Sequence, residues 1–375
     1  MDIIAQSGAV VNINIDNRTL AHLKKKSRAI AKREERKQEA RKDPFAKWQD
    51  HKKRSQIVAG KLDAIGLSKR SKRMKYCATH LEFDFCPDCG NIAVTGAQLC
   101  RDRLCPTCAW RLSLKRYALM SGVMEALYNA YPEYIYSLVT LTVKNPKPHE
   151  LRDTLTIMQE CWRSTINQRW AKDELAGWAR SIEITYNEDT WTFHPHYHII
   201  MMTPQYESVE KIIKEWMRQC SRNGLVTTRK AQASASIEPK DHTEGYSLAK
   251  SICETYKYTI KSDSLVEMPL SYFKAYAEAV DGKRLISLGG LVKEMAKAME
   301  ADKLDDLDET DDNEKVQICM HCKSQELDKI VCEWSWKQGR YIPSVDAHDA
   351  VEAREKERAI EERIATADSL QEPAL

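Results

Sequence analysis

The stretch GWARSIEITYNEDTWTFHPHYHIIMM, residues 177–202, decides the fold. Its two ends, residues 177–187 and 191–202, are rich in β-branched and aromatic side chains, which favour strands. The polar residues NEDT between them are typical of a turn. The stretch therefore predicts two antiparallel strands that form a β-hairpin.

The segments around this hairpin predict a mixed architecture. Alternating β-branched residues predict a strand at 134–145 and a further strand region at 225–239. Apolar spacing predicts helices at 111–131, 148–176, 207–223 and 243–262. Strands and helices alternate with a hairpin in the middle, so we expect an α+β fold, an antiparallel-containing sheet with packed helices.

The second predicted strand of the hairpin carries a histidine pair. His196 and His198 are two residues apart, so both side chains point to one face of a strand. Glu183 lies on the preceding strand, where a hairpin brings it across from the histidines. Two imidazoles and one carboxylate suit Mg²⁺ or Mn²⁺ acting on a phosphate. The alternative is ordinary surface or core histidines.

A cysteine-rich segment precedes the hairpin at residues 76–110. Cys86-Pro-Asp-Cys89 and Cys105-Pro-Thr-Cys108 form two CxxC turns, the spacing of a structural zinc site. The same segment holds Cys77, His80 and Cys100. These three residues either complete a second site or exchange partners with the CxxC cysteines, and one site is then incomplete or uses a distant ligand. Reduced core thiols are the alternative.

The C-terminal part of the chain holds a third CxxC turn. Cys319-x-x-Cys322, with Cys332 ten residues further on, offers no obvious fourth ligand. A third metal site and free thiols are therefore both open.

The segment CETYKYTIK, residues 253–261, predicts a helix that can carry chemistry. Glu254 and Tyr258 are four residues apart and share one helix face, and so do Lys257 and Lys261, which can hold phosphates. A tyrosine can attack a phosphodiester, and a nearby carboxylate can activate water or a hydroxyl group. The alternative is a surface helix with a buried tyrosine.

The charges of the chain are unevenly distributed. The net charge is +3, but residues 18–55 carry 15 Lys/Arg against 5 Asp/Glu, and residues 300–314 carry 9 Asp/Glu against one Lys. The basic arm is either a phosphate-binding or a merely solvated segment. No apolar run is long enough to span a membrane, and the N-terminus lacks a secretory signal. We expect a cytoplasmic protein with reduced thiols and no membrane partner.

Four segments in this order resemble the replication initiators of small rolling-circle plasmids, within the HUH endonuclease superfamily. They are LCRDRLCPTCAWR (99–111), SLVTLTVKN (137–145), HPHYHIIM (194–201) and ETYKYTIK (254–261). The resemblance covers residues 75–262. It implies an HUH endonuclease-like sheet, with the zinc-binding module preceding or inserted in it and with basic N-terminal and charged C-terminal extensions.

The resemblance also implies residue roles. Tyr258 is the expected nucleophile, and His196, His198 and Glu183 are the expected ligands of the divalent ion. Glu254 takes the place of a second catalytic tyrosine and promotes hydrolytic release at termination. Tyr256 lies only two residues from Tyr258, so the two would not share a helix face, and we expect Tyr256 to be non-catalytic.

The reaction that the resemblance implies is origin-specific nicking and rejoining of DNA. The protein would cut one strand at a plasmid double-strand origin, forming a 5′-phosphotyrosine and a 3′-OH that primes synthesis. A host helicase and DNA polymerase are the implied partners, and a homodimer is possible.

Two other functions explain part of the pattern. A zinc-ribbon DNA-binding regulator without catalysis needs only the cysteines and the basic arm. A relaxase or transposase of the same superfamily shares the chemistry, but conjugative relaxases usually carry the tyrosine before the histidines.

We expect five parts in the chain. They are a basic arm (1–70), a zinc-binding module (71–120), a nicking domain (121–298), an acidic linker (299–315) and a C-terminal segment with a charged helix (316–375).

Overall fold

The computed structural model describes residues 3–4, 10–11, 45–238, 246–247, 251–252, 255, 262–299, 318–319 and 321–343. Contacts divide the chain into two units, Met1–Asp50 and His51–Leu375. In the first unit, β1 (Ile3–Ile4) pairs antiparallel with β2 (Val10–Val11). The described part of the second unit holds two sheets with helices packed on them, which confirms the α+β class.

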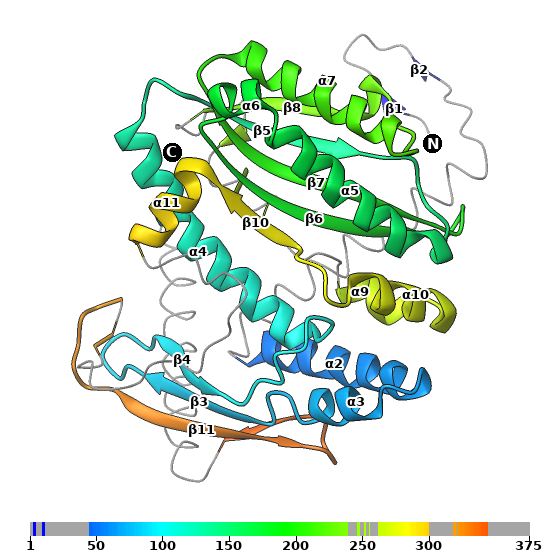
Figure 1. Cartoon of the computed structure of the whole chain (residues 1–375). Helices are drawn as coiled ribbons and strands as arrows, with labels where there is room; N and C mark the ends of the chain where they lie inside the picture. Colours follow the sequence, from blue (N-terminus) through cyan, green and yellow to red (C-terminus); the bar gives the residue numbers. More distant parts are fainter. Residues whose placement is uncertain are drawn as a thin grey trace. The chain divides into compact units, whose positions relative to one another are not determined.

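The larger sheet has six strands in the order β10-β6-β7-β5-β8-β9 (Figure 1). Every neighbouring pair is antiparallel except β8 and β9, which are parallel. The predicted hairpin is confirmed and lies in the middle of the sheet as β6 and β7. In chain order the strands are β5 (Ile135–Thr142), β6 (Gly177–Asn187), β7 (Thr192–Thr203), β8 (Ala233–Glu238), β9 (Tyr246–Ser247) and β10 (Ile286–Gly289).

Two amphipathic helices, α5 (Leu151–Ile166) and α7 (Tyr206–Arg222), pack together beside this sheet. The ring of Trp162 on α5 meets that of Trp178 on β6 edge-to-face at 5.3 Å. The single helix predicted at 148–176 is wrong, because three separate helical segments lie there. A 3₁₀ turn (Pro148–Glu150) precedes α5, and extended backbone at Gln168 separates α5 from α6 (Arg169–Glu174).

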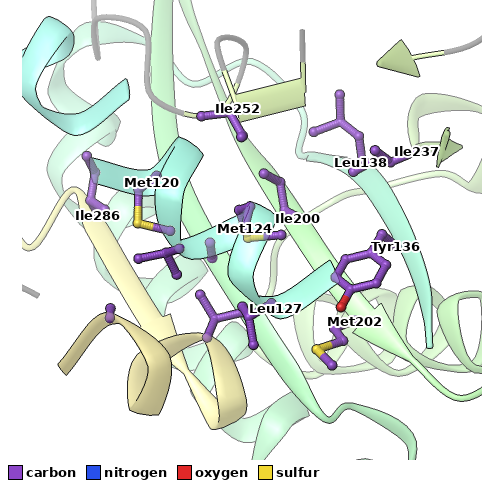
Figure 2. Close-up of a cluster of buried hydrophobic side chains, with 14 residues drawn as sticks. Met120, Met124, Leu127, Tyr136, Leu138, Ile200, Met202, Ile237, Ile252 and Ile286 are labelled. Carbon is purple, nitrogen blue, oxygen red and sulfur yellow. The ribbon is translucent and has the colours of Figure 1, made fainter. Parts of the chain in front are cut away.

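The opposite face of the sheet is covered by α4 (Pro106–Ala130) and α11 (Gly290–Ala298), as Figure 2 shows for their buried side chains. Met120, Met124 and Leu127 of α4 pack in one cluster with Ile200 of β7, and Ile252 completes it. Strand alternation puts Ile200 on the same face as His196 and His198. The cluster therefore fixes the face that carries the histidines.

The smaller sheet joins two distant parts of the chain. Its order is β12-β11-β3-β4, and all its pairs are antiparallel. β11 pairs with β3 over six residues, from Asp328 opposite Phe85 to Glu333 opposite His80. The strands are β3 (His80–Phe85), β4 (Ile92–Ala97), β11 (Asp328–Ser335) and β12 (Arg340–Pro343). The sequence patterns predicted none of these four strands.

The remaining described elements are helical. They are α2 (Ala46–Ala64), α3 (Ser68–Lys75), a 3₁₀ turn (Arg229–Ala231), α9 (Ser262–Glu267) and α10 (Leu270–Val280). The predicted helix at 243–262 is wrong at its start, where β9 extends the sheet. The expected charged helix near the C-terminus lies outside the described residues. No helix in the described part of the chain has both the length and the apolar character that a membrane crossing requires.

Candidate metal centre

The register of the central hairpin brings three predicted site residues together. Glu183 on β6 lies directly opposite His196 on β7, and His198 follows two residues later on the same face. The Oε2 atom of Glu183 is 3.1 Å from Nε2 of His196 and 3.0 Å from Nε2 of His198. The two Nε2 atoms are 3.1 Å apart. One carboxylate and two imidazoles therefore converge on one point.

The spacing of these three atoms fits one bound divalent ion. Ligands at adjacent corners of an octahedron, with metal–ligand bonds of about 2.1 Å, lie about 3.0 Å apart. The three observed separations, 3.0 to 3.1 Å, match one face of such an octahedron. All three side chains are about nine-tenths buried, so few waters compete for them. A set of this kind leaves further coordination positions open for a substrate.

Neighbouring groups orient the imidazole rings. Nδ1 of His196 lies 3.3 Å from the carbonyl oxygen of His194, which can only accept a hydrogen bond. The proton therefore sits on Nδ1 and leaves Nε2 as the ligand atom. Nδ1 of His198 lies 3.4 Å from the hydroxyl of Thr140 on β5. His194 itself is turned toward Asn145, 2.7 Å away, and burial followed by the charge of His196 lowers its pKa.

Two described residues, one just before the predicted nucleophile segment and one within it, are buried. Ile252 packs in the cluster that contains Ile200, and Thr255 is buried, with its hydroxyl donating to the carbonyl oxygen of Ser251. Figure 2 shows Ile252 above Ile200 and Met124. The four residues predicted to act from this segment lie outside the described residues; they are Glu254, Lys257, Tyr258 and Lys261.

One group of four cysteines lies at the start of α4. Its sulfur atoms lie within 4.8 Å of one another and belong to Cys77, Cys100, Cys105 and Cys108. Cys105 caps the helix and Cys108 lies in its first turn, where the helix dipole stabilises thiolates. Pairs of sulfur atoms are 3.5 to 3.7 Å apart. Tetrahedral thiolates on zinc are separated by about 3.8 Å, so the group fits one ion.

Polar contacts hold this first group in place. Arg70 on α3 makes two hydrogen bonds, of 2.7 and 2.9 Å, to the carboxylate of Asp102, which also accepts from the backbone N–H of Leu104. Ser55 lies 3.3 Å from the sulfur of Cys105. Although burial opposes ionisation, hydrogen bonds from the neighbouring thiols keep the pKa of Cys105 well below its ordinary value. The group therefore favours a charged thiolate.

A second group of four cysteines lies at one end of the smaller sheet, where β3 ends and β11 begins. Cys86 and Cys89 meet Cys319 and Cys322, with sulfur–sulfur distances of 3.5 Å across the pairs. Each CxxC turn is followed by a residue with positive φ, Gly90 at 66° and Lys323 at 66°. The two turns thus share one backbone shape, that of a metal-binding loop, although only one of them has a glycine at the strained position.

The structure places the two CxxC turns of residues 76–110 in different groups, one of the arrangements that the sequence left open. Cys86 and Cys89 belong to one group, and Cys105 and Cys108 belong to the other. Of the seven candidates in residues 76–110, six cysteines take part. His80 does not: its Nδ1 lies 2.5 Å from Glu333 and its Nε2 3.1 Å from Glu82.

Comparisons with known proteins place the chain in one family. A sequence model described as "Replication protein" matches residues 91–342, about two thirds of the chain. The chain belongs to the replication protein family. Curated relatives named "Protein rep" include one from Bacillus amyloliquefaciens, 28% identical over 67% of this chain and 81% of the relative, and one from a Bacillus species, 28% identical over 70% and 89%. Another, from Streptococcus pneumoniae serotype 2, is 27% identical over 72% and 83%.

This replication protein therefore has the function that the family carries, initiation of plasmid replication, with DNA as its partner. No solved structure matches the chain. The matched residues 91–342 include the histidine–carboxylate centre and the β11–β12 hairpin. The C-terminal CxxC turn thus lies within the matched residues, whereas Cys86 and Cys89 lie before them.

Two ligand candidates of the replication protein escaped assignment from the sequence. Cys319 and Cys322 were noted as a CxxC turn without a fourth ligand, and their partners proved to be 230 or more residues away. The backbone N–H of Cys322 is the first of several groups that lower the pKa of Cys319, to about 6. Cys332, by contrast, is buried on β11 outside both groups.

Proposed function

We propose that this replication protein is a metal-dependent DNA nickase that cuts one strand at a plasmid double-strand origin through Tyr258. The observation that carries the proposal is the convergence of Glu183, His196 and His198 on one point of a central antiparallel hairpin. This arrangement supports an HUH endonuclease-like fold. A replication initiator needs a free 3′-OH, and nicking supplies one.

The metal centre would bind the phosphate that is cut. Glu183 provides the negative charge and the two imidazoles provide neutral ligands, a donor set that suits Mg²⁺ or Mn²⁺. A bound divalent ion supplies charge that polarises the scissile phosphate. Thr140 and the carbonyl of His194 hold the two imidazole rings in the orientation that this task needs.

Tyr258 would perform the cleavage. Its phenolic oxygen attacks phosphorus, the new O–P bond forms as the bond from phosphorus to the 3′ oxygen breaks, and the 3′ oxygen leaves with a proton as a hydroxyl group. The 5′ end of the cut strand stays joined to the tyrosine. Lys257 and Lys261, one helical turn apart, would hold flanking phosphates.

Glu254 would act when replication ends. As the residue one turn before Tyr258, it can take a proton from water, which then attacks the phosphotyrosine bond and releases the DNA. A carboxylate in this role ends the reaction by hydrolysis, whereas a second tyrosine would allow another strand transfer. Tyr256 stays non-catalytic in this scheme.

The two cysteine groups would each hold a structural zinc ion. All eight sulfur atoms come from cysteines, the donor that zinc prefers in closed structural sites, and their spacings fit a tetrahedron. The sites would fix the start of α4 and the C-terminal hairpin. The host helicase and DNA polymerase, the origin sequence as target, and a homodimer remain predictions from the family resemblance.

Nicking of a supercoiled plasmid that carries the native origin tests the proposal. We expect the wild type, with Mg²⁺ or Mn²⁺, to give nicked circles and a protein–DNA adduct on a denaturing gel. Tyr258→Phe should give neither while binding the origin with unchanged affinity. If both proteins bind the origin and the wild type never nicks it, the chain is a DNA-binding regulator with metal sites.

A further inference from the structure

An exposed surface far along the chain from the proposed nucleophile combines aromatic rings with lysines. Tyr76, at the end of α3, is 48% exposed, and Trp336, in the turn between β11 and β12, is 49% exposed. Their rings meet edge-to-face at 5.8 Å. The two residues lie 260 positions apart in the sequence, and the pairing of β11 with β3 brings them together (Figure 1).

A buried lysine supports the inner side of Trp336. The Nζ atom of Lys52 lies 5.3 Å from the centre of the Trp336 ring and donates hydrogen bonds to the carbonyl oxygens of Lys75 and Cys77. Lys52 has no exposed area, whereas nearly half of Trp336 is exposed. The indole is therefore anchored from below while its outer part faces solvent, which is how a preorganised stacking platform is built.

Exposed basic side chains surround this platform. Lys75 and Tyr76 lie three and four residues after Lys72, so all three lie on one side of α3 and its C-cap. The ammonium of Lys75 lies 5.8 Å from the Trp336 ring. Lys337, the residue after Trp336, is also exposed. Within the described part of the chain, none of these three lysines forms an ion pair.

We propose that this surface, formed by Tyr76, Trp336, Lys72, Lys75 and Lys337, binds single-stranded DNA separately from the nicking centre. Rings with an exposed face stack on unpaired bases, and lysines beside them hold the phosphates that connect those bases. Duplex DNA hides its base faces and offers only phosphates to the lysines. This inference rests on the proposed function, in which the protein acts on DNA. It adds a second site that binds the single strand released by nicking.

Binding of a labelled 20-nucleotide oligo-dT by the full chain, followed by fluorescence anisotropy, tests this surface. We expect Trp336→Ala to weaken the single-strand affinity by about tenfold and Trp336→Phe, which keeps a stacking ring, to weaken it less. Affinity for a 20-base-pair duplex should change far less. Tyr206→Ala removes another exposed aromatic ring, on α7, and serves as the matched control.

The lysines are tested by the salt dependence of the same measurement. Lys72→Ala/Lys75→Ala should lower the slope of log affinity against log salt by about 1.4, since each phosphate contact on a single strand contributes about 0.7. Lys293→Ala/Lys297→Ala, an exposed pair on α11, should leave the slope unchanged.

Two results would overturn the proposal. One is an unchanged single-strand affinity in Trp336→Ala, or a loss that Tyr206→Ala reproduces. The other is an equal loss for the duplex, which would mean that no base stacks on the ring. Because oligo-dT carries no origin and is not cut, these outcomes do not depend on whether Tyr258 nicks DNA.

Discussion

Replacing Ile252 by alanine should uncouple the nucleophile segment from the metal centre. Ile252 is 1% exposed and packs in the cluster with Ile200, two residues beyond His198 on the same face of β7. Among the described residues, it is also the buried large apolar side chain nearest before Tyr258 in the sequence. Loss of this anchor removes the contacts of residue 252 with the cluster and leaves the three candidate metal ligands unchanged.

The size of the effect follows from the burial of the side chain. Truncation of a fully buried isoleucine to alanine costs about 2–5 kcal/mol, and about 1.4 kcal/mol corresponds to a factor of ten. If about 3 kcal/mol of this cost weakens the packing of the segment on the cluster, the population of chains with the segment packed falls by up to about a hundredfold. We therefore expect the nicking rate to fall between about tenfold and a hundredfold.

Single-turnover nicking of an origin oligonucleotide, at saturating metal and at a temperature where the protein is folded, measures this loss. Leu127→Ala is the matched control, because Leu127 is equally buried in the same cluster but belongs to α4 (Figure 2). It should cost similar global stability in urea and leave the nicking rate near that of wild type. Equal nicking rates in the two variants would refute the positioning role of Ile252.

Three further predictions concern the metal sites and the small sheet. His198→Ala should abolish nicking and weaken Mn²⁺ binding by more than a hundredfold in a calorimetric titration, with the circular dichroism spectrum unchanged; intact Mn²⁺ affinity would exclude His198 as a ligand. Cys322→Ser should lower the zinc content from two ions to one per chain and speed hydrogen exchange in β11, whereas Cys161→Ser, outside both groups, should retain two; retention of both ions in Cys322→Ser would contradict the second site. Hydrogen bonds to Glu333, and to a smaller extent to Glu82, raise the pKa of His80. Protonated His80 therefore stabilises the fold fully below its ordinary pKa of 6.5, and this stabilisation is lost as the pH rises through the raised pKa. The urea stability of wild type should therefore exceed that of His80→Gln most at about pH 6, and a gap that widens with rising pH would disprove this linkage.

The sequence alone was sufficient to predict the central hairpin and the position of the three candidate metal ligands on it. Period-two alternation and a polar turn specify a hairpin locally, which places Glu183 across from the histidines. The turn lies one residue later than predicted, so the exact partner of Glu183, His196, comes from the structure. The helices that became α4 and α7 were also predictable, because each buries one continuous apolar face.

The pairing of the cysteines was not predictable in the same way. A CxxC turn supplies two of the four ligands of a tetrahedral site and does not indicate where the other two come from. Cys86 and Cys105 are close in sequence, but β11 pairs with β3 and carries Cys319 and Cys322 to the first turn instead. That pairing depends on strands separated by more than 240 residues, and the local pattern of β11 gave no sign of it.

The central claim, that Tyr258 cuts DNA beside the histidine–carboxylate centre, is tested most directly by mapping the covalent adduct. The wild-type protein would be trapped on a single-stranded origin oligonucleotide with Mn²⁺, digested with nuclease and protease, and analysed by mass spectrometry. We predict a nucleotide joined through its 5′-phosphate to Tyr258, in the peptide containing residues 258–261. A 5′-phosphonucleotide on Tyr256, or nicked DNA with no modified tyrosine, would contradict this account.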